Sequence, residues 1–206
     1  MRKLVLKMSM SLDGFVGAAD GGLEWMFKSM DPAGTAWTVD KITGAGLHIM
    51  GSRTFQDMTG WWPTSKESFA APMNEIPKAV FSRSGKLGES TQALQDAIRL
   101  RGKEQGALSP HAHSWAEAEV IGGDLKAGIE RLKKQDGNFI LAHGGASFAR
   151  SLIATGLVDE YQLLIFPVAL GAGLAIFSGL DAPLRLTLIE HRTFATGVAA
   201  HVYQPA

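Results

Sequence analysis

Short apolar runs alternate with longer amphipathic segments along most of the chain. The runs have the length and the aliphatic or aromatic content of strands that are buried in a sheet. Polar stretches that contain glycine or proline separate them from the segments on either side. This pattern predicts seven strands, over residues 4–10, 47–50, 77–82, 139–142, 161–166, 185–192 and 198–203.

Between these runs, apolar residues recur at helical spacing. The clearest helix starts after Asp124, whose side chain suits an N-cap, and ends at Gly137. Leu125 and Leu132 share one of its faces, while its lysines lie on the other. The predicted helices cover residues 37–45, 52–58, 91–101, 124–137 and 146–155.

The order of these elements predicts the fold class. Helices and strands alternate at first, and the last two strands are close enough to pair antiparallel. We therefore expect an α/β protein with a mixed, mostly parallel central sheet of about eight strands and helices on both faces. One domain over residues 1–206 is expected, with residues 85–114 as a surface insertion. The residues expected to be buried are Leu4, Leu6, Ile49, Val80, Ile140, Leu141, Leu163 and Ile165.

Composition and charge narrow the classes of function. Of the 206 residues, 46% are hydrophobic and 19% charged, which suits a soluble domain with a full core. Twenty basic residues balance twenty acidic ones, so no overall field draws the chain to nucleic acid or to a membrane. The absence of cysteine excludes disulfides and thiolate chemistry and is compatible with a reducing compartment. We expect a cytoplasmic protein with no nucleic-acid or membrane partner.

Two glycine-containing turns are the most informative motifs. Gly51 follows one predicted strand and precedes a predicted helix, and Gly144-Gly145 occupies the same position between another strand and helix. A helix start offers unpaired N–H groups and the positive end of its dipole, and glycine lets a phosphate approach the backbone. Two such turns at the same edge of a sheet predict a pyrophosphate site.

A third predicted strand ends in Ser82-Arg83, a hydroxyl and a guanidinium suited to a phosphate monoester. No Gly-x-Gly-x-x-Gly follows the first strand, and no acidic residue lies where a dinucleotide fold of the common type binds the adenosine ribose. Together the three motifs predict a phosphorylated dinucleotide such as NADPH, bound outside the common dinucleotide fold.

The order and spacing of several motifs resemble the dihydrofolate reductase superfamily. Within it, the chain is similar to the branch that includes the C-terminal reductase domain of the bifunctional deaminase-reductase of riboflavin biosynthesis. The resemblance covers nearly the whole chain. The matching segments are residues 11–17, 51–55, 81–83, 144–145, 156–160 and 166–173. It implies a three-layer dihydrofolate-reductase-like fold and NADPH as cofactor, in an extended pose across the carboxyl ends of the central strands.

The resemblance also implies roles for individual residues. The backbone of Val16 and Gly17 would hold the nicotinamide amide, and Ser82 and Arg83 would bind the adenosine 2′-phosphate. The remaining cofactor-binding residues form the two pyrophosphate cradles; they are Gly51, Arg53 and Thr54 in one, and Gly144, Gly145 and Ala146 in the other.

The expected reaction is hydride transfer from NADPH to a small heterocyclic or sugar-derived carbonyl or imine, as in 5-amino-6-(5-phosphoribosylamino)uracil reductase. Glu24, Asp31 and Asp40 are the nearby carboxylates that could donate a proton or anchor the substrate. Glu24 and Asp40 are the predicted proton donors, with Glu24 preferred. Ser11, Asp13 and Trp25 are expected at the substrate. Dihydrofolate reduction is an alternative, although no acid occupies the position in the first helix where those enzymes bind the pterin ring.

Other interpretations remain open at this stage. A nucleotide- or flavin-binding module without turnover would show the same cradles. His48 and His143 lie in strand-like runs and are interpreted as core or pocket-wall residues, and no metal site is expected at His111 and His113 because a third ligand is missing. The glycine-broken apolar stretch Phe166–Phe177 predicts a homodimer contact.

Overall fold

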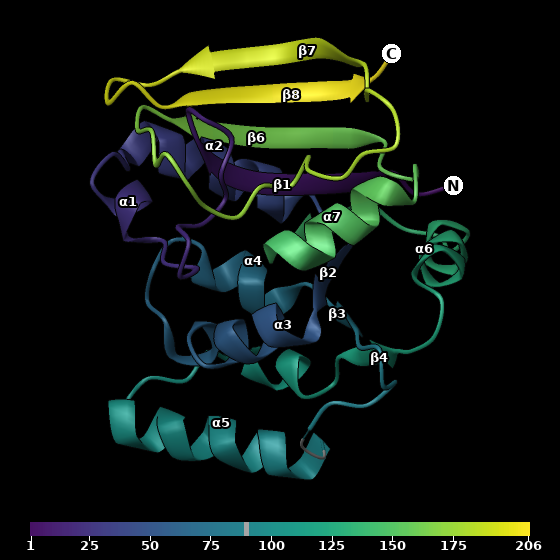
Figure 1. Cartoon of the computed structure of the whole chain (residues 1–206). Helices are drawn as coiled ribbons and strands as arrows, with labels where there is room; N and C mark the ends of the chain where they lie inside the picture. Colours follow the sequence, from purple (N-terminus) through teal and green to yellow (C-terminus); the bar gives the residue numbers. More distant parts are fainter. Residues whose placement is uncertain (89–90) are drawn as a thin grey trace.

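The apolar run near the N-terminus forms β1 (Leu4–Ser11), an inner strand of an eight-stranded sheet (Figure 1). The structure is a computed structural model, and it describes residues 1–88 and 91–206. The other strands are β2 (Leu47–Gly51), β3 (Lys78–Phe81), β4 (Glu119–Ile121), β5 (Ile140–His143), β6 (Glu160–Phe166), β7 (Leu186–Thr193) and β8 (Ala199–Pro205).

The sheet is mixed and mostly parallel, in the order β4-β3-β2-β5-β1-β6-β8-β7. β1 pairs in parallel with β5 on one side and with β6 on the other. β8 runs antiparallel to both of its neighbours, β6 and β7. The predicted antiparallel strand at the C-terminal end is thus confirmed, and so is the fold class.

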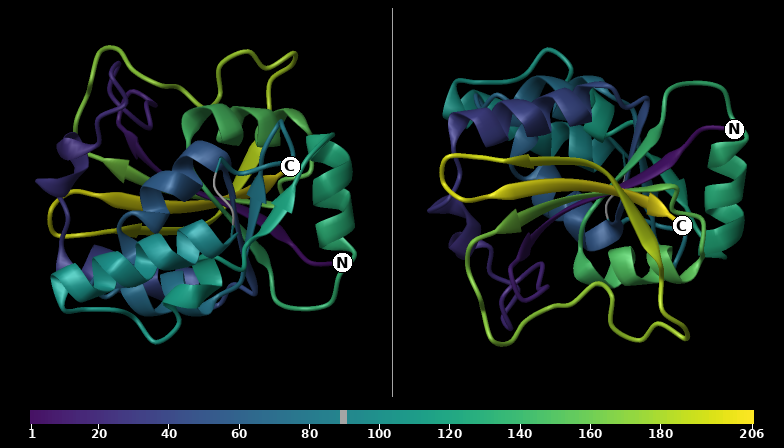
Figure 2. Two further views of the ribbon diagram at one scale, coloured as in Figure 1. Left: turned by 90° about the horizontal axis from the view of Figure 1, so that it is seen from below. Right: turned by 90° about the horizontal axis from the view of Figure 1, so that it is seen from above.

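Seven α-helices and two 3₁₀ turns are found in the part of the chain that the structure describes, on both sides of the twisted sheet (Figure 2). They are α1 (Glu24–Phe27), α2 (Pro32–Thr43), α3 (Ser52–Thr59), α4 (Ala70–Glu75), α5 (Thr91–Gln105), α6 (Leu125–Lys133), α7 (Ala146–Ala154), η1 (Trp62–Thr64) and η2 (Ala112–Trp115).

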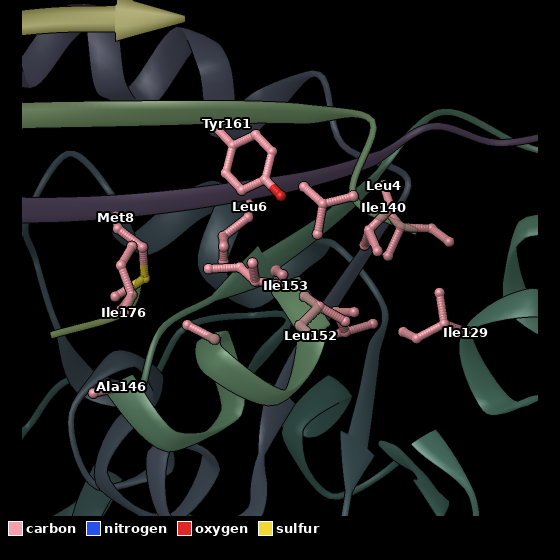
Figure 3. Close-up of a cluster of buried hydrophobic side chains, with 14 of the residues drawn as sticks. Leu4, Leu6, Met8, Ile129, Ile140, Ala146, Leu152, Ile153, Tyr161 and Ile176 are labelled. Carbon is pink, nitrogen blue, oxygen red and sulfur yellow. The ribbon is translucent and has the colours of Figure 1, made fainter. Parts of the chain in front are cut away.

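Alternate residues of the strands point to opposite faces of the sheet, and the two larger cores lie one on each face. A third, smaller core joins Trp37 of α2 to Phe166 and Phe194. Leu4, Leu6 and Ile140 pack against Leu152 and Ile153 of α7 on one face (Figure 3). The opposite face joins other residues of the same strands to the helices α2 to α5 and to η2; its fully buried members include Val80, Leu141, Met73 and Trp115. The helices on both faces are therefore held by the period-two alternation that the sequence shows.

The predicted buried residues are confirmed with one exception. Seven of the eight are at most 4% exposed. Ile165 is only partly buried and packs at the margin of the first core. It lies one residue before the end of β6, where the neighbouring elements no longer cover it completely.

Two predicted helix boundaries are corrected, and one strand was missed. The helix expected to end at Gly137 ends at Lys133. The helix expected at residues 37–45 begins earlier, at Pro32, because Asp31 caps it and accepts a hydrogen bond from the Gly34 amide at 2.7 Å. Strand β4 was not predicted, since its three residues are too short for a periodic signal.

The segment 85–114, expected to be a surface insertion, lies between β3 and β4 and contains α5. Residues 89–90 of this predicted insertion lie outside the described residues. Ile98 of α5 is buried against the second core. No helix in the described ranges is both long and apolar enough to cross a bilayer.

Candidate active site

A cavity of about 1320 Å³ opens where the parallel strands β1, β2, β3 and β5 end. Its size exceeds that of a typical site for one small ligand, so it can hold a dinucleotide and a substrate together. All ten predicted cofactor residues line it, namely Val16, Gly17, Gly51, Arg53, Thr54, Ser82, Arg83, Gly144, Gly145 and Ala146.

The two glycine turns meet each other in this cavity. The Thr54 hydroxyl in the first turn of α3 donates a hydrogen bond to the Gly144 carbonyl, with 3.0 Å between the oxygens. Gly145, the N-cap of α7, has a φ of 88°, and a Cβ there would lie 2.6 Å from Thr54 Oγ1. A side chain at this position would fill the space between the helix starts. Glycine therefore keeps the cradle open.

Among the residues that the structure describes, no side chain caps the start of α3 or of α7. Gly51 precedes α3 and Gly145 precedes α7, so the first N–H groups of both helices keep no side-chain acceptor. Such groups attract anions, and two adjacent starts suit the two phosphates of a pyrophosphate. This arrangement fits the dinucleotide that the sequence predicts.

Ser82 and Arg83 lie at the end of β3 beside this cradle. Ser82 is buried and donates a hydrogen bond to the Lys86 carbonyl at 2.7 Å, which fixes the turn after the strand. Arg83 is exposed and forms no ion pair within residues 1–88 and 91–206. Its guanidinium is thus available for a phosphate monoester.

The loop after β1 brings Val16 and Gly17 to the cavity. The Val16 amide donates to the Leu174 carbonyl at 2.9 Å, and the Leu174 amide donates to the Gly17 carbonyl at 2.9 Å. Across the described chain, the Val16 carbonyl and the Gly17 amide have no backbone partner. These two groups are the ones that a carboxamide could bind.

Lys7 and His143 line the floor of the cavity. The sequence analysis interprets His143 as a core or pocket-wall residue and does not assign Lys7 to the site. They are register partners on β1 and β5 and so project from the same face of the sheet. The Lys7 ammonium has no hydrogen-bond or ion-pair partner among the described residues. Burial lowers the pKa of Lys7 to about 8 and, with the charges of Lys7 and Lys78, that of His143 to about 3.

His48 lies directly behind His143. The two rings meet edge to face with centroids 4.5 Å apart. Both nitrogens of His48 and Nε2 of His143 lack a hydrogen-bond partner in the described part of the chain. Burial is also the main cause that holds the pKa of His48 well below its usual value. His48 is therefore a core residue and His143 a wall of the cavity, both with neutral rings.

The predicted proton donors lie elsewhere. Glu24 on α1 and Asp40 on α2 are exposed, and neither lines the cavity. Thr35, Thr38 and Ile42 of α2 do line it, and Asp40 falls on another face of the helix. The structure thus does not bring these two carboxylates to the site.

Ser11, Asp13 and Trp25, predicted at the substrate, do not line the cavity either. The Ser11 hydroxyl donates to Asp13 Oδ1 at 2.6 Å, so both side chains organise the loop after β1. Trp25 packs edge to face on Phe166, with ring centroids 5.5 Å apart. Phe166 borders the cavity, whereas Trp25 does not. These residues support the site from behind.

Four carboxylates do line the cavity; they are Asp20, Asp31, Asp57 and Glu67. Asp31 accepts hydrogen bonds from the Gly34 amide and, at 2.9 Å, from the Thr196 hydroxyl. These bonds, that from Gly34 above all, lower the pKa of Asp31, which opposes a role as proton donor.

Lys7 could have been noticed in the sequence as a lone charge on an inward-facing position of a buried strand.

Comparison with known proteins identifies the family of this fold. The chain is 28% identical over 202 residues to YyaP, an uncharacterized protein of Bacillus subtilis, covering 98% of this chain and 94% of that protein. It superposes with a TM-score of 0.69 and 15% identity on a diaminohydroxyphosphoribosylaminopyrimidine deaminase/5-amino-6-(5-phosphoribosylamino)uracil reductase of Thermotoga maritima, covering 100% of this chain and 57% of that one.

A dihydrofolate reductase of Enterococcus faecalis, in complex with NADP(H), superposes with a TM-score of 0.59 at 12% identity. The match covers 98% of this chain and 96% of that enzyme. The fold is therefore that of the dihydrofolate reductases, as the sequence motifs imply. A family profile described as the RibD C-terminal domain matches residues 2–200, and the chain belongs to this family of reductase-like domains.

Proposed function

We propose that this protein is an NADPH-dependent reductase that transfers a hydride to a small heterocyclic or sugar-derived carbonyl or imine. The observation that carries the proposal is one cavity that joins two uncapped helix starts, a free Arg83 and the unpaired ammonium of Lys7. The first two features suit a phosphorylated dinucleotide, and the third suits a polar acceptor atom of a substrate.

The residues present fit NADPH. The space that a Cβ at Gly145 would fill is open, and the uncapped N–H groups of α3 and α7 face the same cavity. Arg83 would bind the 2′-phosphate, and the Val16 carbonyl and Gly17 amide would bind the carboxamide. When bound, the cofactor supplies the hydride, and the protein orients the substrate and provides a proton.

Lys7 is the proposed source of that proton. When a hydride reaches the carbon of a C=O or C=N group, the electron pair of the broken π bond moves to the heteroatom, which then needs a proton. The Lys7 ammonium can donate one from Nζ, and its pKa of about 8 lies close to neutral pH, where general acids are most effective. Neutral His143 beside it does not compete as an acid.

The cation at the cavity floor also argues against folate reduction. Pterin recognition in dihydrofolate reductases depends on a carboxylic acid, and here Thr35 and Thr38 of α2 and Lys7 of β1 line the chamber. Asp31, before α2, also lines it, but its carboxylate is held by the Gly34 amide and the Thr196 hydroxyl. A positive group favours a neutral or acceptor-rich heterocycle over one that must be protonated to react. An aminouracil, as in the reductase of the Thermotoga protein, is such a heterocycle.

The test is NADPH oxidation with 5-amino-6-(5-phosphoribosylamino)uracil and its dephosphorylated form, followed by loss of cofactor absorbance. Lys7→Met should lower turnover by about a hundredfold or more and leave NADPH affinity unchanged. Lys3→Met, an exposed lysine outside the cavity, should turn over normally. Wild-type turnover should fall as the pH rises through about 8, because the ammonium is then lost. NADPH binding without turnover of any such heterocycle would contradict the proposal and favour a binding module.

We also propose a homodimer that uses the surface of residues 166–177. Its support is the glycine-broken apolar sequence of this segment. Light scattering at micromolar concentration should give twice the chain mass, and a monomer mass would contradict the assembly.

A further inference from the structure

Exposed apolar side chains gather around the mouth of the cavity. Eleven large apolar residues are exposed in the described ranges of the chain, and five of them border this one cavity; they are Leu23, Phe27, Met30, Trp61 and Leu174. Exposed apolar surface that is concentrated at one hollow marks a binding site. The mouth therefore offers apolar contact to the ligand that the cavity binds.

The exposed aromatic rings belong to two separate walls. Phe27, at the end of α1, is 60% exposed, and α1 buries none of its four residues. Trp61, between α3 and η1, is 56% exposed, while its neighbour Trp62 packs edge to face on Phe69 with ring centroids 6.1 Å apart. All four rings border the cavity. Aromatic side chains on two walls suit a flat ring system that stacks on them.

The inner floor of the cavity is polar. Lys7 and Ser9 lie two residues apart on β1 and so share one face of the sheet, and His143 is the register partner of Lys7. Like the Lys7 ammonium, the Ser9 hydroxyl and Nε2 of His143 form no hydrogen bond within the residues that the structure describes. His143 is only 5% exposed, so its unpaired nitrogen points to a polar ligand.

A flavin ring has the same division into a polar and an apolar end. Its pyrimidine end carries two carbonyl groups, an N–H group and the acceptor nitrogens N1 and N5, and its other end is a benzene ring with two methyl groups. The ammonium of Lys7 supplies donors, and the hydroxyl of Ser9 and the neutral imidazole of His143 each supply a donor and an acceptor. The pyrimidine end therefore matches the floor, and the dimethylbenzene end matches the apolar mouth at Phe27 and Trp61.

We infer that the cavity binds a flavin ring next to NADPH and that the protein reduces free flavin. The inference rests on the proposed function for NADPH as the hydride donor, and it names a substrate that this function leaves open. A small polar ring such as a uracil would reach the floor but would leave the aromatic walls uncovered. A tricyclic ring reaches both.

The step is a two-electron transfer that balances. The C4–H bond of the dihydronicotinamide breaks and an N5–H bond forms, so the nicotinamide is oxidised and the flavin is reduced. The electron pair of the N5=C4a bond moves through the conjugated ring to N1. The Lys7 ammonium stabilises this negative charge, donates a proton from Nζ to N1 and later regains one from water.

The probes are lumiflavin and lumazine, neither of which carries a sugar or a phosphate. Both contain the same pyrimidinedione end, but only lumiflavin has the dimethylbenzene ring. Calorimetry on the complex with NADP⁺, in which no hydride can be transferred, should show lumiflavin bound about tenfold more tightly, because it buries more apolar surface. The double variant Phe27→Ala/Trp61→Ala should bring this ratio close to one by weakening only lumiflavin. Leu100→Ala, at an exposed apolar position on α5 outside the cavity, should change neither affinity.

The second measurement is the anaerobic reduction of lumiflavin by NADPH, followed as loss of the flavin absorbance. The wild-type protein should exceed the rate without protein by about a hundredfold or more. Lys7→Met should lose most of this acceleration, and Leu100→Ala should keep all of it.

The outcomes separate this inference from the proposed function. Similar affinities for lumiflavin and lumazine, or a ratio that the double variant leaves unchanged, overturn the inference even if the enzyme reduces an aminouracil. Lumiflavin that binds as expected but is not reduced overturns it as well. Reduction of lumiflavin without turnover of the aminouracils supports the inference and removes the aminouracils from the proposed function. If NADPH itself does not bind, both fail together.

Discussion

The carboxylate of Asp13 accepts a hydrogen bond from the backbone amide of Gly171, with 2.7 Å between Oδ2 and the nitrogen. It also accepts one from the Leu170 amide at 3.1 Å. The bonds from Ser11, Gly171 and Leu170 lower the pKa of Asp13 to about 2, so the carboxylate stays ionised at any physiological pH. One side chain thereby joins the loop after β1, which carries Val16 and Gly17, to the segment after β6.

Replacement of Asp13 should therefore affect one end of the cofactor selectively. Asp13→Ala leaves the two amides without their acceptor and loosens the loop that would hold the nicotinamide. The affinity for NADPH should fall roughly three- to tenfold, because a mispositioned loop weakens the contacts it carries. Adenosine 2′,5′-bisphosphate, which lacks the nicotinamide, should bind as before in calorimetry. Equal losses for both ligands would indicate general destabilisation instead.

Arg83 should determine the choice between the two nicotinamide cofactors. Arg83→Ala should weaken NADPH binding by roughly 1.5 to 3 kcal/mol, the range for charge-assisted hydrogen bonds, and leave NADH binding nearly unchanged. Arg99→Ala serves as a control, since Arg99 lies on α5 with a side chain that is 66% exposed. The measurement is a titration of both nucleotides against all three proteins. A loss of the same size for NADH would contradict the assignment of Arg83 to the 2′-phosphate.

Gly145 and Gly156, at the two ends of α7, form a matched pair. Both have positive φ, but a Cβ at Gly145 would lie 2.6 Å from Thr54 Oγ1, whereas one at Gly156 would meet nothing within 4 Å. Each substitution by alanine should cost about 1 kcal/mol or more of stability from backbone strain. Only Gly145→Ala should weaken NADPH and NADH, by similar factors, because it alone fills the pyrophosphate cradle. Retained affinity in Gly145→Ala would exclude this cradle.

His143 should make the protein sensitive to mild acid. Its pKa is about 3 in the folded chain and about 6.5 when unfolded, so between these values the unfolded state binds more protons. Stability is therefore lost as the pH falls below about 6.5. From about pH 7 to about pH 5 the loss from this residue is about 2 kcal/mol.

His143→Phe removes one of the two buried imidazoles whose pKa is lowered and should make that decline in urea unfolding shallower, while the contribution of His48 remains. His191→Phe, at an exposed position on β7, should leave it intact. An unchanged slope in His143→Phe would mean that His143 does not remain neutral in the folded protein.

Much of the fold could be predicted because its signals are local. The alternation in residues 4–10 identifies β1 and its two faces, and Gly144-Gly145 after an apolar run identifies the start of α7. Asp31-Pro32 was an equally local N-cap signal that the predicted helix boundary overlooked. Strand β4 gave no such signal, since it exists only through its pairing with β3.

The candidate site was predictable only where backbone motifs form it. Phosphate cradles depend on turns that glycine marks in the sequence, and all of their residues line the cavity. Whether a candidate proton donor reaches the cavity depends on which face of its helix or strand borders it. Asp40 and Thr38 are two residues apart on α2, yet only Thr38 borders it. Lys7 meets His143 because β1 and β5 are neighbours, which no short stretch of sequence reveals.

The position of β1 between β5 and β6 also sets the order in which the chain can fold during synthesis. β1 is synthesised first, but it pairs with Ile140 and its neighbours on one edge and with residues 160–166 on the other. Neither edge of β1 can therefore be paired until most of the chain has been made. Parallel pairing between strands that lie so far apart in the sequence is slow. The apolar strand β1 stays exposed until its partners have been made. A nascent chain that stops before β6 would keep one edge of β1 open. Truncated products of this protein are therefore expected to aggregate through their first strand.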